Sequence, residues 1–271
     1  MKICIAGKNQ IAINALEYLY QKLGIDKKNI LICTNNNDNG KDTWQPSLLK
    51  FSISNKIKVI SIHELYHIKD LFFISLEFDK ILNPSLFETK NLFNIHFSLL
   101  PKYKGMFTSI FPILNGDDVS GVTLHKIDKG IDTGEIIDNY SFPINITDTS
   151  RDLYLKYMNY GFKIFKNNIE KLLSLNFSTE PQGFFGSTYN SKNSINFNKI
   201  EIDLNKTSIE IHNQIRAFIF AEYQLPSVKN NKIISSQITN HKIEVNYFKK
   251  SGNLIELSGI DGFKVLLKIF K

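Results

Sequence analysis

The chain has 271 residues, 42% of them hydrophobic, which is enough for one large domain with a buried core and a second, smaller domain. The net charge of +7 suits nucleic acid, an anionic membrane or an anionic small substrate, but the lysines are scattered, which favours a solvated lysine-rich surface. The two cysteines form no metal-binding pattern and no apolar run reaches about 18 residues, so we expect no metal site, no disulfide scaffold and no membrane span.

The N-terminal segment reads as a strand, a helix and a second strand. Residues 2–6 form a continuous apolar run, residues 11–23 have helical apolar spacing, and residues 29–34 form another apolar run. This βαβ order implies a parallel sheet, and because no signal-peptide pattern precedes it we expect a cytoplasmic protein. The turn after the first strand lacks GxGxxG, so no dinucleotide cofactor is indicated. The start of the helix is an alternative site for a substrate phosphate.

The alternation of strands and helices continues as far as residue 96. Further strands are expected at residues 58–60, 71–75 and 92–96, with short helices at 47–51 and 64–68 and one that ends at 87. This pattern predicts a Rossmann-like, doubly wound, mostly parallel α/β sheet. Ligands of such sheets lie beyond the carboxyl ends of the strands.

The remainder of the chain separates into two parts. A helix at 108–115, a half-buried strand at 119–126, a strand at 135–140 and a capped helix at 151–174 complete a catalytic domain that we expect to span residues 1–177. Residues 178–271 are expected to form a small, mainly β domain, which begins with a loop-rich passage and a helix. Its predicted elements are the helix at 208–220, strands at 232–236, 242–248, 254–257 and 264–270, and hairpin turns at 249–253 and 259–262.

An amide and an imidazole stand together at the end of the predicted strand 92–96. Asn94 and His96 are two residues apart and therefore face the same side of the strand. A glycine-rich turn at 128–134 adds carboxylates, among them Asp132. A histidine alone is more often structural, but an amide, an imidazole and a carboxylate together are the groups that acyl transfer to a nucleophile requires.

Three motifs resemble the catalytic core of the folate-dependent formyltransferases, a family that includes methionyl-tRNA formyltransferase, glycinamide ribonucleotide transformylase and the sugar N-formyltransferases. They are Asn94-Ile-His96-Phe-Ser-Leu-Leu-Pro101-Lys-Tyr-Lys-Gly105, Gly121-Val-Thr-Leu-His125 and Asp128-Lys-Gly-Ile-Asp132-Thr-Gly134. The resemblance covers roughly residues 1–220. It implies transfer of a formyl group from the cosubstrate N10-formyltetrahydrofolate to a primary amine, without a metal.

The resemblance also assigns roles. Asn94 is expected to donate to the oxyanion of the tetrahedral intermediate, and His96 to move the proton near neutral pH. Asp132 is expected to orient His96 and to raise its pKa through its opposite charge. The residues implied to bind the folate are Lys80, Ile81, Leu82, Asp128, Lys129, Gly130 and Ile131.

The molecule that accepts the formyl group is inferred from the differences between this chain and individual members of the family. A glycinamide ribonucleotide transformylase would end near residue 200, and a tRNA formyltransferase would carry a basic loop near the first helix and a longer basic C-terminal domain. Met106 stands where relatives that act on nucleotide-linked aminoarabinose carry arginine. The chain looks closest to enzymes that act on dTDP-3-amino-3,6-dideoxyhexoses, which implies a role in the biosynthesis of a surface glycan such as lipopolysaccharide.

In that interpretation Phe220 or Tyr223 stacks on thymine and Arg216 helps to neutralise the diphosphate, with Lys8 and Lys102 as alternative cations. An equally simple alternative is that the aromatic side chains are core at a domain interface. The residues expected to contact the nucleotide sugar are Lys8, Lys102, Met106, Arg216, Phe220 and Tyr223.

The expected partner is a nucleotide-linked amino sugar, with no nucleic acid and no membrane. A homodimer is implied by the resemblance and by the apolar strands at 233–234 and 265–269, which are expected to be exposed. Two alternatives stay open. A methionyl-tRNA formyltransferase would bind initiator tRNA with strong salt dependence. A non-catalytic folate- or nucleotide-binding protein would not need Asn94, His96 and Asp132 together.

Overall fold

The computed structural model describes residues 1–270, which form two compact units. Unit 1 contains Met1–Lys104, Gly121–Ser141 and Tyr157–Tyr189. Unit 2 contains Gly105–Ser120, Phe142–Lys156 and the chain from Asn190 onward. The expected division into a catalytic domain at 1–177 and a C-terminal domain at 178–271 stays a prediction.

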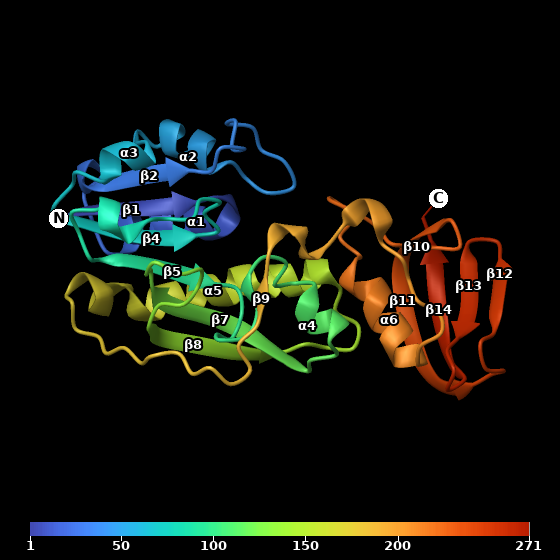
Figure 1. Cartoon of the computed structure of the whole chain (residues 1–271). Helices are drawn as coiled ribbons and strands as arrows, with labels where there is room; N and C mark the ends of the chain where they lie inside the picture. Colours follow the sequence, from blue (N-terminus) through green and yellow to red (C-terminus); the bar gives the residue numbers. More distant parts are fainter. Residues whose placement is uncertain (271) are drawn as a thin grey trace. The chain divides into compact units, whose positions relative to one another are not determined.

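A seven-stranded sheet forms the centre of unit 1, in the order β3-β2-β1-β4-β5-β7-β8 (Figure 1). Strands β1 to β5 pair in parallel, and β7 runs antiparallel to β5. The predicted Rossmann-like, mostly parallel fold is thereby confirmed. The strands are β1 (Lys2–Gly7), β2 (Ile30–Thr34), β3 (Lys58–Val59), β4 (Leu71–Leu76), β5 (Leu92–His96), β7 (Val119–Lys126) and β8 (Ile136–Pro143).

Helices cover both faces of this sheet. The helices are α1 (Asn9–Glu17), α2 (Leu48–Ser54), α3 (Ile62–Leu65) and α5 (Ser150–Leu173). Cys4, Cys33 and Phe73 pack with α3 on one face. On the other face Gly161 of α5 lies so close to Ile11 and Ile95 that a Cβ there would meet them. Because both faces are covered, all residues of β4 are buried, as its continuous apolar run predicts.

Three expectations for unit 1 and its neighbouring segments need correction. The helix expected at 11–23 starts at Asn9 and becomes a π-helical turn over Tyr18–Lys22. The helix expected at 108–115 is only α4 (Phe111–Leu114), because Pro112 is tolerated only in a first helical turn. The strand 119–126 was expected to be half-buried, yet Thr123 and His125 are buried as well, since the segment that follows β5 and the turn that follows β7 cover them.

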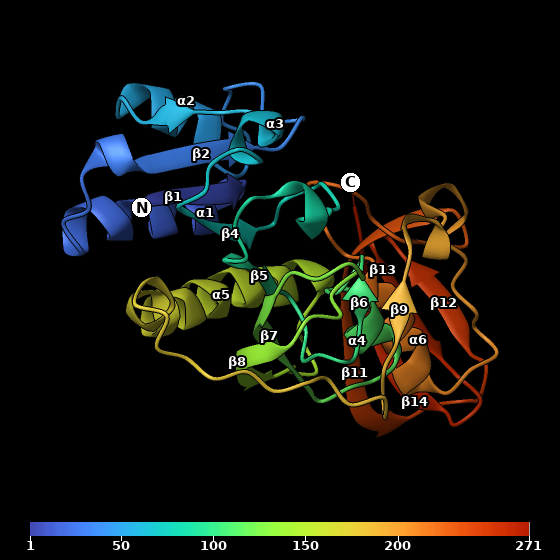
Figure 2. The same ribbon diagram turned by 60° about the vertical axis from the view of Figure 1, so that its left-hand side comes forward.

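Unit 2 contains a five-stranded antiparallel sheet in the order β10-β11-β14-β13-β12 (Figure 1), and Figure 2 shows this sheet from another side. Helix α6 (Ser208–Ala217) packs on it through Ile211 and Ile215. The strands are β10 (Ser227–Val228), β11 (Asn231–Lys242), β12 (Phe248–Ser251), β13 (Leu254–Ser258) and β14 (Phe263–Ile269). The mainly β character is confirmed, but the separate strand expected at 242–248 is wrong, because β11 extends to Lys242 and β12 begins only at Phe248. The expectation that the strands at 233–234 and 265–269 expose apolar residues is also wrong for Ile233, Val265 and Leu267, which are buried against α6 in the core of unit 2.

One further ladder matters for the site. Strand β6 (Lys104–Gly105) pairs with β9 (Tyr189–Asn190). The backbone N–H of Lys104 donates to the carbonyl of Thr188. The segment after β5 is thereby tied to a segment more than eighty residues later, which is a contact that no local pattern reveals.

Candidate active site

Two neighbouring strands place four polar side chains in register. In the β5–β7 ladder Asn94 lies opposite His125, and His96 lies opposite Thr123. Directly opposed residues of an antiparallel pair have Cβ atoms about 5 Å apart, so their side chains interact. The predicted common orientation of Asn94 and His96 is confirmed, since both side chains reach Asp132.

The amide of Asn94 is held by two acceptors. Its Nδ2 lies 3.1 Å from Nε2 of His125 and 3.3 Å from Oδ1 of Asp132. Nδ1 of His125 lies 2.7 Å from the carbonyl oxygen of Lys126, which can only accept, so Nδ1 carries the proton. Nε2 of His125 is therefore an acceptor, and the two N–H groups of Asn94 point at His125 and Asp132.

The imidazole of His96 lies between a carbonyl and a carboxylate. Its Nε2 is 2.8 Å from the carbonyl oxygen of Tyr103, and its Nδ1 is 3.4 Å from Oδ2 of Asp132. Since the carbonyl only accepts, Nε2 carries the proton in the neutral ring, and Nδ1 is left as the basic nitrogen facing Asp132. His96 is placed to accept a proton at Nδ1 and to share the resulting positive charge with Asp132.

Hydrogen bonds at both ends of the loop after β5 hold the Tyr103 carbonyl in position against His96. Thr123 donates from Oγ1 to the carbonyl of Ser98 at 2.7 Å and accepts from the N–H of Leu100 at 3.1 Å. At the far end of the loop the N–H of Tyr103 donates to Oγ1 of Thr188 at 2.7 Å. Threonines from two distant segments therefore fix the partner of His96.

The turn that carries Asp132 is closed by its own side chains and by Gln182. Oδ1 of Asp128 accepts from the N–H of Gly130 at 3.0 Å and from Oγ1 of Thr133 at 2.6 Å. Nε2 of Gln182 donates to the carbonyl oxygens of Asp132 at 2.9 Å and Gly134 at 2.8 Å. Asp132 itself has a φ of 53°, so these contacts hold a left-handed backbone that an aspartate seldom adopts.

Burial lowers the pKa of His96 below its ordinary value. The side chain is 8% exposed, and loss of solvent outweighs the charge of Asp132 and the Tyr103 carbonyl, both of which act to raise the pKa. Asp132 acts to raise the pKa of His96, as expected, but the net shift is downward because burial, which the sequence motif does not display, outweighs it. A neutral His96 is the form that can accept a proton.

The residues expected to bind the folate lie in two loops of unit 1. Lys80, Ile81 and Leu82 follow β4, with Ile81 exposed and Leu82 packed against the core. The other four residues precede Asp132 in its turn; Asp128, Lys129 and Gly130 are exposed and Ile131 is half-buried. Exposed apolar surface in one loop and accessible backbone in the other suit a flat ring, and their folate-binding role stays a prediction.

The residues expected to contact the acceptor are distributed over both units. In unit 1, Lys8 stands at the N-terminal boundary of α1, and Lys102 is exposed in the loop after β5. In unit 2, Met106 and Tyr223 are exposed, Tyr223 by 61%. These positions are accessible to a ligand, and their role in binding the acceptor stays a prediction.

Arg216 and Phe220 are buried within unit 2. Arg216 is 4% exposed, and its Nη1 donates to the carbonyls of Asn145 at 3.1 Å and Asp148 at 2.8 Å. Phe220 packs against Tyr154 and Tyr223. Both side chains have packing roles within unit 2, and their contact with a nucleotide stays a prediction.

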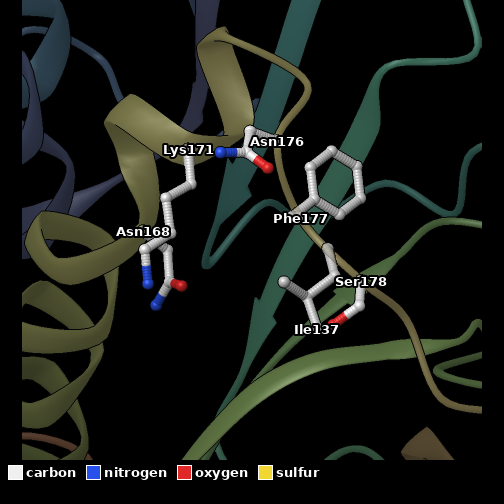
Figure 3. Close-up of a pocket in the computed structure, with 6 residues that line it drawn as sticks. All are labelled: Ile137, Asn168, Lys171, Asn176, Phe177 and Ser178. Atoms are coloured by element: carbon white, nitrogen blue, oxygen red, sulfur yellow. The ribbon is translucent and has the colours of Figure 1, made fainter.

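A surface hollow of about 540 Å³ lies elsewhere in unit 1, between β8 and the end of α5 (Figure 3). It contains none of the expected site residues. Its lining consists of Ile137, Asn168, Lys171, Asn176, Phe177 and Ser178.

Two negative findings apply to the described residues 1–270. No group of three or more His, Cys, Asp or Glu side chains is arranged to hold a metal ion. Within the same residues, every helix is too short or too polar to cross a membrane.

Several residues that support the cluster were not singled out as site residues from the sequence, among them His125, Gln182 and Thr188. His125 was grouped only with the alternating pattern of its strand and with a motif of the resemblance, although its register opposite Asn94 gives it a direct contact. Gln182 and Thr188 lie in a passage interpreted as a loop. Gln182 and Thr188 are connected with the site only by long-range hydrogen bonds, which cannot be recognised from a single sequence.

Comparisons with known proteins place this geometry among related folds. The formyl transferase family model matches residues 62–169. The solved structure of an N-formyltransferase from Helicobacter canadensis, in complex with folinic acid and dTDP-3-aminofucose, is 51% identical, with a TM-score of 0.97 over 100% of both chains. WlaRD, described as a sugar 3N-formyl transferase in the presence of dTDP and 5-N-formyl-THF, is 50% identical, with a TM-score of 0.97 over 100% of this chain and 98% of that one. Methionyl-tRNA formyltransferase of Fervidobacterium nodosum is 26% identical over 230 residues, which are 80% of this chain and 71% of that protein.

Proposed function

The chain belongs to the formyltransferase family, and from this premise we propose that it transfers the formyl group of N10-formyltetrahydrofolate to the amino group of a dTDP-linked amino-dideoxysugar. A 3-amino-3,6-dideoxyhexose is the favoured sugar. The observation that carries the proposal is the Asn94, His96 and Asp132 cluster in a chain that is about half identical, over its full length, to two sugar N-formyltransferases.

His96 moves the proton in the proposed reaction. The neutral amine attacks the formyl carbon, the new N–C bond forms, and the amine nitrogen becomes positively charged. Nδ1 of the neutral His96 takes this proton, and Asp132, 3.4 Å away, stabilises the imidazolium. As the bond between the formyl carbon and N10 breaks, His96 returns a proton to N10, so the imidazole ends the cycle neutral.

Asn94 stabilises the charge that develops on the formyl oxygen. Its two N–H groups point at His125 and Asp132, and the bond to Asp132 is the longer, at 3.3 Å. When His96 becomes cationic it draws the Asp132 carboxylate toward itself, and the N–H that faced Asp132 can then be shared with the oxyanion. His125 keeps the other N–H and so fixes the plane of the amide.

The residues present fit a folate as cosubstrate. The exposed Ile81 offers apolar surface, and the accessible backbone at 128–130 offers hydrogen-bonding groups to a flat heterocycle. When bound, the formyl-folate supplies an activated one-carbon group. The glycan destination, the cytoplasmic location and the homodimer expected from the sequence belong to this proposal.

A panel of acceptors tests the proposal. Purified protein is incubated with N10-formyltetrahydrofolate and, in separate reactions, a dTDP-3-amino-3,6-dideoxyhexose, the 4-amino isomer and methionyl-tRNA, and kcat/KM is measured for each. We expect the 3-amino sugar to have the largest kcat/KM. A larger value for the 4-amino isomer would correct the regiochemistry, while salt-dependent formylation of tRNA alone would identify a tRNA formyltransferase and refute the proposal.

A further inference from the structure

A pair of adjacent aromatic rings is exposed to solvent on the surface of unit 1. Phe184 and Phe185 are 79% and 83% exposed, and their ring centroids lie 4.3 Å apart at an interplanar angle of 34°. Single exposed apolar side chains are ordinary, but two adjoining phenylalanines that stay in water contribute little to folding. Such a pair is typical of a surface that binds a ligand.

Both ends of the segment that carries the pair are fixed to the catalytic cluster. We call residues 182–188 the strap. At its start, Gln182 donates to the carbonyls of Asp132 and Gly134. At its end, Thr188 accepts from the N–H of Tyr103, whose carbonyl holds His96. The strap therefore joins the support of the carboxylate to the support of the imidazole.

The length of the strap limits how far the rings lie from these anchors. A residue spans at most about 3.6 Å, so the Cα of Phe184 lies within about 7 Å of the Cα of Gln182. Gly183 and Gly186 flank the pair, and a Cβ at Gly183 would meet nothing within 4 Å. The rings are thus anchored beside the cluster on a short segment with open space around it.

Lysines adjoin the same segment. Nζ of Lys104 donates to Oγ of Ser187 at 3.0 Å. A Cβ at Gly186 would lie 4.0 Å from Cγ of Lys102, so the stem of that exposed lysine runs beside the strap. Flat rings next to cations match the two parts of a nucleoside diphosphate, a base and a charged diphosphate.

We propose that Phe184 and Phe185 form the stacking surface for the base of the nucleoside diphosphate portion of the acceptor, with the diphosphate toward Lys102 and Lys104. This inference rests on the proposed function and names a base site different from the Phe220 or Tyr223 site expected from the sequence. The strap links binding of the base to the position of the catalytic residues, because the segment that carries the two rings also supports Asp132 and Tyr103.

Equilibrium binding of two separate probes, dTDP and folinic acid, tests the inference. The variants are F184A/F185A, F184L/F185L, F184Y/F185Y, Y223A and the control F270A, which removes an exposed phenylalanine from unit 2. We expect F184A/F185A to weaken dTDP binding about tenfold, within the roughly 5- to 150-fold range of base stacking. F184L/F185L is also weakened because leucine keeps the apolar surface but loses the flat ring, whereas F184Y/F185Y restores binding. Folinic acid binding and all properties of F270A stay as in the wild type.

Several results would overturn the inference. Weakened folinic acid binding with unchanged dTDP binding would assign the rings to the folate, and weakened dTDP binding in Y223A alone would assign the base to Tyr223. A changed oligomeric state with unchanged dTDP binding would make the pair an interface between copies of the chain. If the wild type formylates a nucleotide sugar while F184A/F185A keeps its KM, this inference fails and the proposed function stands. If the wild type formylates no nucleotide sugar, the proposed function itself fails.

Discussion

Replacing Asp132 by asparagine removes the charge that faces the base while nearly preserving its shape. Nδ1 of His96 and Oδ2 of Asp132 are 3.4 Å apart. At that separation two unit charges attract by about 5 kcal/mol at an effective dielectric constant of about 20. The asparagine amide keeps part of this attraction through the dipole of its carbonyl. Its N–H can also donate to the lone pair of Nδ1, and Nδ1 is then no longer available to accept a proton. We therefore expect kcat of D132N to fall by about 10²- to 10⁴-fold.

The pH dependence of D132N gives a second readout. His96 acts in its neutral form, so activity is lost as the pH falls through its pKa. Burial already places that pKa below the ordinary value, and Asp132 opposes the shift. Removal of Asp132 lowers the pKa of His96 further, so the residual activity of D132N should persist to lower pH than wild-type activity.

The assay measures amine-dependent formyl transfer across the acidic pH range, with dTDP binding and thermal unfolding of each variant alongside. The matched control is D70N, since Asp70 is an exposed carboxylate that precedes β4 and pairs with the N-terminus. D70N should behave like the wild type. Wild-type kcat in D132N, or an acid limb that moves to higher pH, would refute the role given to Asp132. Loss of folding together with activity would show that Asp132 is structural.

Three further predictions follow from particular contacts. H125L removes the acceptor of one Asn94 N–H, so kcat should fall about 10- to 100-fold with unchanged dTDP affinity, and a normal kcat would show that this contact is dispensable. G134A would place a Cβ 1.8 Å from the Lys126 carbonyl, so the turn must shift and activity should fall sharply. In G252A a Cβ meets nothing, and the strain of its positive φ of 59° falls on a hairpin turn of unit 2, so G252A should lose some stability but little activity; equal activities in the two variants would contradict this reasoning. Burial lowers the pKa of His212, so the unfolded chain binds its proton more readily and stability should decline as the pH drops below about 6.5. The urea midpoint of H212Q should decline less with acidification, and an unchanged decline would contradict the assignment.

Local sequence patterns predicted the elements whose burial follows from their own residues. The continuous apolar run of β4 and the two-residue spacing of Asn94 and His96 depend only on strand geometry, and both predictions are confirmed. The separate strand expected at 242–248 failed because the pairing of β11 with β14, including a register shift near Lys242, decides where that strand ends.

The site was less predictable than the fold, because its contacts join distant parts of the chain. His125 was interpreted from the alternation of its strand, but its role depends on which residue of β5 lies opposite it. The direction of the His96 pKa depends on burial by the whole fold, which outweighs the one charge that the motif displays. Gln182 belongs to a passage of loop composition, and only its bonds to the Asp132 turn connect it with the site.

Transfer of an isotope-labelled formyl carbon tests the central claim most directly. Wild-type protein and H96N are each incubated with donor labelled at the formyl group and a dTDP-3-amino-3,6-dideoxyhexose, and the label is followed by NMR. We expect the label to appear in the N-formyl amide of the sugar with the wild type. With H96N it should appear at least about 100-fold more slowly, at unchanged dTDP affinity. A label that never reaches the sugar, or that reaches it equally fast with both proteins, would contradict formyl transfer by this cluster.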